Sequence, residues 1–141
     1  MLPSGLPTLV ADNEDIARFL TQSSYYSTQE VKPAAFMPSP NSRETSVSRH
    51  GQEPMTNLQA LGRAAAGTRN LHGAAVLRSR AVREAFLEVL ADEPPERHAV
   101  IRKWPWPDDA DMRKAQQKEI AQQLAAAAGA PVLFEGAGVK T

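Results

Sequence analysis

The segment His98-Ala-Val-Ile-Arg-Lys-Trp104 decides the fold prediction, because it is the clearest strand pattern in the chain. Its β-branched and aromatic residues favour extended backbone, and Pro105 ends the strand. A long helix is predicted next, since Asp108 or Asp109 can cap its first turn and Gly129 suits the position after its last turn. A strand followed by a capped helix indicates that both element types build the core.

Two segments before this strand are predicted to form an antiparallel hairpin. Residues 44–49 alternate, with Thr45 and Val47 on one face, as in a half-buried strand. Residues 31–37 are also biased towards apolar side chains, but Pro33 cannot donate a hydrogen bond and confines this strand to an edge or a bulge. A loop rich in Pro and Ser would connect the two strands.

A short amphipathic helix is predicted near the N-terminus. Asp12 or Asn13 can cap its start. Ile16, Phe19 and Leu20 then follow at the i, i+3 and i+4 spacing of one buried helix face. We therefore expect about two turns of helix here, with one apolar stripe.

The central part of the chain contains one clear helix and one ambiguous segment. Thr56 stands three residues before Gln59, as in a capping box, and Gly67 marks the end of that helix. Residues 79–90 allow two interpretations. They form either one helix or a short helix followed by a strand.

These patterns predict an α+β fold with a small, mostly antiparallel sheet packed by about three helices. A chain of 141 residues is long enough to bury one core, so residues 1–141 are predicted to be a single domain. Residues 131–134 are expected to be a terminal strand and residues 136–141 a flexible tail.

The composition limits the classes of partner and compartment. Sixteen Lys and Arg balance sixteen Asp and Glu, so the chain lacks the strong basic excess of a dedicated nucleic-acid binder. The chain has no cysteine, which excludes disulfides, thiolate nucleophiles and iron–sulfur clusters. It has no signal-peptide pattern and no long apolar stretch. We therefore expect a cytoplasmic protein with no membrane partner.

One segment of this neutral chain is locally positive. Residues 49–83 contain six arginines and one acid, Glu53. Arginine suits phosphate because its planar fork makes two parallel hydrogen bonds and stays charged. The alternative is that these arginines form only the solvated faces of helices and loops. The candidates for anion or nucleic-acid binding are Arg63, Arg69, Arg78, Arg80 and Arg83.

His98 is the candidate catalytic residue, with Arg97 and Arg49 as candidate helpers. A histidine can act as general acid or base, and a nearby arginine can stabilise developing negative charge. Neighbouring residues of a strand point to opposite faces, so Arg97 and His98 share a site only if the strand begins after them. The alternative is a histidine at the edge of the sheet whose hydrogen bonds are satisfied and which has no catalytic role.

The sequence predicts neither a metal nor a cofactor. His50, His72 and His98 lie more than twenty residues apart, so no two have a metal-ligand spacing. The glycines of residues 136–139 have no following helix, which a phosphate-binding loop requires.

Two aromatic pairs are candidates for contact with a protein partner. Tyr25 and Tyr26 lie in a predicted loop, and Trp104 and Trp106 flank Pro105. Such side chains supply large contact areas with few rotatable bonds. Packing over the core is the alternative for both pairs.

The segment Arg97-His-Ala-Val-Ile-Arg-Lys-Trp-Pro105 resembles a family of small uncharacterised bacterial proteins. Residues 31–36 and 46–49 share this resemblance, which therefore extends over most of the chain. It implies a bacterial, cytoplasmic origin and a shared purpose for Arg49, Arg97 and His98. It transfers no activity.

The absence of a catalytic motif favours a small intracellular binding or accessory protein that acts through protein–protein contact, in a defence, counter-defence or toxin-control setting. One alternative is a phosphate-directed hydrolase or transferase that uses His98 with nearby arginines. A second alternative is nucleic-acid binding through residues 49–83. The oligomeric state and the partner stay open.

Overall fold

A six-stranded antiparallel sheet organises the fold. The computed structural model describes residues 2–50 and 55–134, so the predicted tail at 136–141 lies outside the described residues. The strands are β1 (Asp15–Leu20), β2 (Thr45–Arg49), β3 (Gly73–Arg78), β4 (Glu88–Ala91), β5 (His98–Arg102) and β6 (Val132–Leu133). Their order in the sheet is β4-β5-β2-β1-β3-β6.

Three α-helices and two short 3-10 helices complete the described part of the chain. They are α1 (Met55–Ala66), α2 (Ser79–Glu84), α3 (Ala110–Ala128), η1 (Ser23–Tyr25) and η2 (Pro33–Ala35). The predicted α+β class is therefore confirmed. No helix in the described part of the chain combines the length and apolar character needed to cross a membrane.

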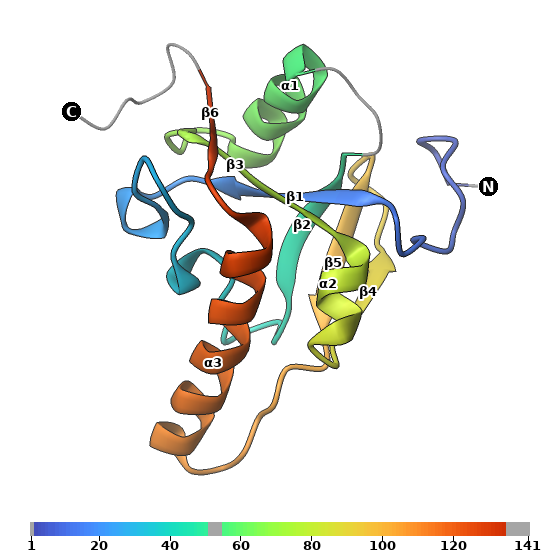
Figure 1. The fold of residues 1–141 in the computed structure, drawn as a ribbon. Coiled ribbons are helices and arrows are strands. Elements are labelled where there is room, and N and C mark those ends of the chain that lie inside the picture. Colours follow the sequence, from blue (N-terminus) through green and yellow to red (C-terminus); the bar gives the residue numbers. More distant parts are fainter. Residues whose placement is uncertain (1, 51–54, 135–141) are drawn as a thin grey trace.

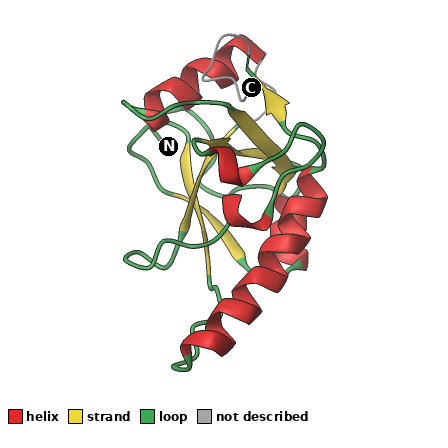
Figure 2. Ribbon diagram, turned by 90° about the vertical axis from the view of Figure 1, so that its left-hand side faces the viewer, coloured by secondary structure: helices red, strands yellow, loops and turns green. Residues whose placement is uncertain are grey.

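The two faces of the sheet carry two apolar clusters. Successive side chains of a strand point to opposite faces. Ile16 and Leu20 of β1 belong to the larger cluster, with α2 and α3. Ala17 and Phe19 belong to the smaller cluster, with α1. α1 and α3 thus pack on opposite faces of the sheet, and the long α3 runs along one side of the molecule (Figures 1 and 2).

The predicted helix over residues 12–20 is wrong, because Asp15–Leu20 forms the strand β1. This strand is central and pairs with β3 along all six of its residues. Both faces of β1 are covered, so its four apolar residues are all buried. A strand buried on both faces lacks alternation, and its apolar residues can fall by chance at helical spacing.

The predicted hairpin between residues 31–37 and 44–49 is also wrong. Residues 44–49 contain β2, but β2 lies between β1 and β5. Pro33–Ala35 forms η2, and Val31 makes an isolated bridge. The fixed φ of proline suits the first turn of a helix, and its lack of an N–H excludes it from a sheet interior.

The elements around the clearest predicted strand are confirmed. β5 spans His98–Arg102, and Asp109 caps α3 by accepting the backbone N–H of Met112. Gly129 follows α3 with a φ of 68°, as expected of a residue that ends a helix. Of the two interpretations of residues 79–90, the short helix followed by a strand is confirmed.

The separation of β1 from β2 positions the candidate site. These strands pair at Ile16 with Arg49 and at Ala17 with Ser48, and the pairing ends there. Beyond this point they diverge, and Figure 1 shows β1 crossing β2 rather than running beside it. The side chain of Arg18 bridges the gap and donates to the Ser46 carbonyl.

Candidate functional site

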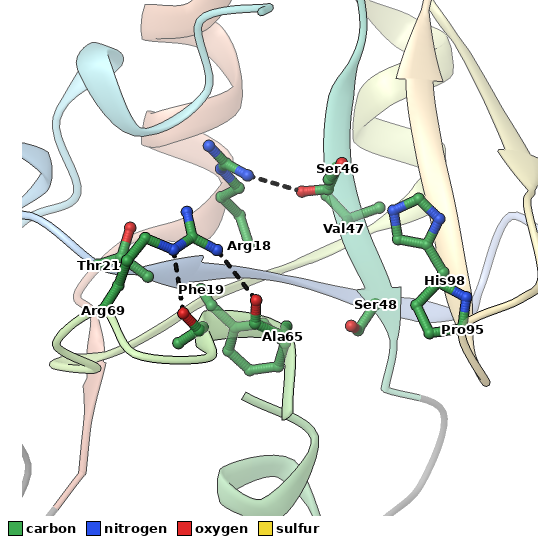
Figure 3. Close-up of a pocket in the computed structure, with 11 residues that line it drawn as sticks. Arg18, Phe19, Thr21, Ser46, Val47, Ser48, Ala65, Arg69, Pro95 and His98 are labelled. Carbon is green, nitrogen blue, oxygen red and sulfur yellow. Dashed lines mark hydrogen bonds between the residues drawn. The ribbon is translucent and has the colours of Figure 1, made fainter. Parts of the chain in front are cut away.

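A pocket of about 210 Å³ lies where β1 and β2 separate (Figure 3). Strands β1, β2 and β5 form part of its wall, and the end of α1 with the following turn closes the other side. Among the described residues, no Asp or Glu lines this pocket. Its polar lining residues are Arg18, Thr21, Ser46, Ser48, Arg69 and His98.

Arg18 brings a positive charge to the gap between the strands. Its Nε donates to the Ala35 carbonyl at 2.7 Å and its Nη1 to the Ser46 carbonyl at 3.0 Å. Burial lowers the pKa of Arg18 and the charge of Arg69 lowers it further, while Tyr25 acts in the opposite direction. A guanidinium still stays protonated at neutral pH. Arg18 is therefore a cation bonded to neutral acceptors.

Arg69 is the second cation of the pocket. Its Nε and Nη2 donate to the carbonyls of Ala66 and Ala65, at 3.1 and 3.0 Å. These carbonyls belong to the last turn of α1, where a positive charge is favourable. In the described part of the chain, neither Arg18 nor Arg69 forms an ion pair. Two like charges thus share one pocket without a lining carboxylate.

His98 lies on the opposite wall, directly across from Ser48 in the β2–β5 register. Its Nδ1 lies 3.0 Å from the Asp92 carbonyl oxygen and 3.2 Å from the Asp92 carboxylate. A carbonyl oxygen only accepts hydrogen bonds, so Nδ1 carries a proton and Nε2 is the ring nitrogen left for a ligand. The pocket therefore unites the predicted catalytic residue His98 with Arg69 of the predicted anion-binding set.

Arg49, a candidate helper of His98, has a different role. Its side chain is fully buried, and its Nε and Nη2 bind the two carboxylate oxygens of Glu14 at 2.6 and 2.9 Å. Its Nη1 donates to the Pro7 carbonyl at 2.6 Å. The guanidinium of Arg49 is thus occupied by Glu14 and the N-terminal segment.

Arg97 does not share the pocket of His98. It precedes β5 with a φ of 67° and lines a separate cavity beside Leu61 of α1. Its Nη1 donates to the Arg49 carbonyl at 3.2 Å. The structure therefore separates two side chains that are adjacent in the sequence.

The positive charge of residues 49–83 is largely offset in space. Arg78 pairs with Asp15 at 3.2 Å, and Arg83 pairs with Asp12 at 2.7 Å. Together with the buried Arg49, half of the six arginines have acidic partners within residues 12–15. The predicted nucleic-acid surface loses much of its charge in this way. Of the other three arginines, one lines the pocket, Arg69, and two are exposed outside it, Arg63 and Arg80.

Burial separates the four candidate aromatic residues. Tyr26 and Trp104 are only 2% and 6% exposed, so they are core residues and cannot provide the predicted partner surface. Tyr25 is half-buried, and its ring centroid lies 5.8 Å from the Arg18 guanidinium carbon. Trp106 is half-buried as well, with the Arg43 guanidinium 4.8 Å from its ring centroid.

Metal ligands do not gather in the part of the chain that the structure describes, where no three His, Asp or Glu side chains come together. His72 Nδ1 lies 2.8 Å from the Tyr26 hydroxyl, inside the core. His98 faces Asp92.

Two functional candidates were not predicted from the sequence. Arg18 stands among four apolar residues of β1, and a charge in such a segment is costly to bury without a purpose. That pattern is the signal that could have identified it. Phe86 is 92% exposed with a φ of 65°, and no sequence pattern distinguishes it from a core residue.

Comparisons of the chain with protein-family models, with curated proteins and with solved structures give no match.

Proposed function

We propose that this protein binds a phosphate-bearing ligand in the pocket between α1 and β2. The observation that supports the proposal is that Arg18 and Arg69 both line this pocket, with no carboxylate in its described lining. A bound anion would offset the repulsion between the two cations. Phosphate suits this position because a planar guanidinium can bind two of its oxygens.

The opposite wall supplies further polar groups for the same ligand. Ser46, Ser48 and His98 line the pocket, where the serine hydroxyls can donate to phosphate oxygens and His98 can donate through Nε2 when both ring nitrogens are protonated. With Nδ1 of His98 held by Asp92, its Nε2 can also accept a proton from water. A phosphate-directed hydrolase or transferase is the enzymatic form of this proposal.

Isothermal titration calorimetry with inorganic phosphate tests the proposal. The wild-type protein should bind phosphate, and Arg69→Ala should weaken binding by about tenfold or more, because one charged hydrogen bond contributes about 1.5–3 kcal/mol. Arg63→Ala is the matched control, since Arg63 is an exposed arginine of α1 outside the pocket. Equal affinity of the wild type and Arg69→Ala would contradict the proposed site, as would the absence of binding to the wild type.

Contact with a protein partner is the second candidate, and Phe86 supports it. This side chain lies on the turn between α2 and β4, and β4 is an edge strand. A left-handed backbone is unfavourable for a bulky residue, and a large exposed aromatic side chain gains nothing from solvent. Exposed aromatic residues often anchor protein interfaces. Phe86 therefore replaces Tyr26 and Trp104 as the partner-binding candidate.

Affinity capture with two matched variants tests this second candidate. A partner retained by the wild type should be lost with Phe86→Asp. It should be kept with Met112→Asp, which places the same charge on another apolar side chain that is 52% exposed. Loss of the partner with both variants, or with neither, would remove Phe86 from the interface.

A further inference from the structure

We infer that the phosphate-bearing ligand is a nucleoside monophosphate, an inference that rests on the proposed function. A second cavity adjoins the phosphate pocket, because Arg18 and Ser46 line both. The second cavity lies between β2, the loop before it and the segment around Tyr25. One ligand can therefore place its phosphate on one side of Arg18 and its remaining part on the other.

The two cavities differ in size, as a nucleoside monophosphate requires: the smaller one can hold the phosphate and the larger one the nucleoside. The phosphate pocket has a volume of about 210 Å³, and the adjoining cavity has about 420 Å³. Small-molecule sites usually span roughly 300–1,000 Å³. A free phosphate needs only the smaller space, so the adjoining cavity indicates a larger organic part.

The charged residues that line the two cavities determine which end of the ligand lies in each cavity. Arg69 and His98 line only the phosphate pocket, whereas Glu44 lines only the adjoining cavity. A carboxylate repels phosphate and accepts hydrogen bonds from amino and hydroxyl groups. The phosphate therefore belongs beside Arg69, and a neutral group that donates hydrogen bonds belongs beside Glu44. Nucleobases and ribose provide such donors.

The adjoining cavity also provides surfaces for a flat ring. Tyr25, Met37, Pro38 and Pro40 line it. Aromatic side chains stack on nucleobases independently of base identity, because every base has a flat face. A sugar phosphate without a base would leave these apolar surfaces without contact, so a nucleotide is the better match.

Titration calorimetry with four ligands tests the inference: inorganic phosphate, ribose 5-phosphate, and the monophosphates of adenosine and guanosine. At least one nucleotide should bind about tenfold more tightly than ribose 5-phosphate, as expected for one stacked base. Glu44→Gln should reduce this gain about fivefold or more and leave phosphate affinity unchanged. Glu84→Gln is the control, since Glu84 is an exposed acid at the end of α2.

Each other outcome overturns the inference. If ribose 5-phosphate or inorganic phosphate binds as tightly as the nucleotides, the nucleotide assignment is wrong and the phosphate site stands. If Glu44→Gln leaves the nucleotide gain intact, the base does not occupy the adjoining cavity. If no ligand binds, including inorganic phosphate, the proposed function itself fails.

Discussion

Arg49 and Arg18 lie on neighbouring strands, yet their charged side chains have different kinds of partner. Arg49 lies at the end where β1 and β2 are paired, and both oxygens of Glu14 bind its guanidinium. Arg18 lies where the same strands separate, and its partners are the neutral carbonyls of Ala35 and Ser46. One charge is compensated by the protein itself. The other shares a pocket with a second arginine.

This difference separates a structural role from a binding role. A buried charge with a complete set of partners is compensated within the fold and leaves nothing for a ligand. A cation that lacks a carboxylate partner beside a second cation gains from an anion supplied by solvent or by a ligand. The proposed phosphate site therefore lies at Arg18 and Arg69, whereas Arg49 binds the N-terminal segment.

The largest expected effect is on stability at the paired end. Arg49→Met should lower the free energy of unfolding by about 3–5 kcal/mol, because it leaves the Glu14 carboxylate without its partner. Urea denaturation measures this change, and Arg63→Met at an exposed position is the control. A loss below about 1 kcal/mol would remove the distinction between the two interior arginines.

The next largest expected effect is stabilisation of the folded protein by a ligand bound at the open end of the β1–β2 pair, where the two strands separate. Phosphate at about a hundred times its dissociation constant should raise the free energy of unfolding of the wild type by about 2.7 kcal/mol. Thermal unfolding at constant ionic strength measures the shift, with sulfate and chloride compared in parallel. Arg69→Ala should lose about half of the shift or more at the same phosphate concentration, as a tenfold or greater loss of affinity requires. An equal shift in both proteins would indicate a nonspecific salt effect.

A smaller effect is expected from Arg18 itself. Arg18→Met should lower the free energy of unfolding by only about 1–2 kcal/mol, since two hydrogen bonds are lost while the repulsion with Arg69 is removed. The same variant should lose phosphate binding in calorimetry. A stability loss as large as that of Arg49→Met would show that Arg18 is also primarily structural.

The smallest expected effect is a pH dependence of the free energy of unfolding that arises from Glu93, which lies near Arg49. Burial raises the pKa of Glu93, but hydrogen bonds from the Ser4 hydroxyl and from the backbone of Ser4 and Arg97, with the charge of Arg49, hold the pKa below its usual value of 4.5. The resulting stability is present above the unfolded-state pKa and is lost as the pH falls through the folded-state pKa. Removal of the Ser4 hydroxyl should shrink this contribution.

Urea denaturation from pH 7 down to pH 3 measures that contribution. The stability difference between the wild type and Ser4→Ala should be constant above about pH 5 and should decrease towards acid. Ser27→Ala is the control, because the Ser27 hydroxyl accepts from backbone N–H groups and not from a carboxylate network. A difference that does not change with pH would contradict the role of Glu93.

Elements with strong local signals were predictable from the sequence. β5 has β-branched residues, α3 has an Asp cap and a terminal glycine, and both are found as expected. β1 was not predictable, because its burial on both faces depends on α1 and α3, which are distant in the sequence. The separation of β1 from β2 also arises from the whole sheet, and no local pattern encodes it.

The candidate site was predictable only in part, because it also depends on contacts between residues that are distant in the sequence. His98 and Arg69 were identified by residue type, and the structure places both on one pocket. Arg49, Arg78 and Arg83 were assigned to a positive segment because their acidic partners, at residues 12–15, lie far from them in the chain. Local charge in a sequence omits such distant partners. Arg18 was missed because its segment was assigned to a helix.

The most direct test of the central claim is an NMR titration with inorganic phosphate that follows the Nε–Hε signals of the arginine side chains. We predict that the signals of Arg18 and Arg69 shift together and saturate with one dissociation constant, while the signal of Arg49 does not move. No saturable shift of Arg18 and Arg69, or equal shifts at every arginine, would contradict the assignment of a binding role to the open end of the β1–β2 pair.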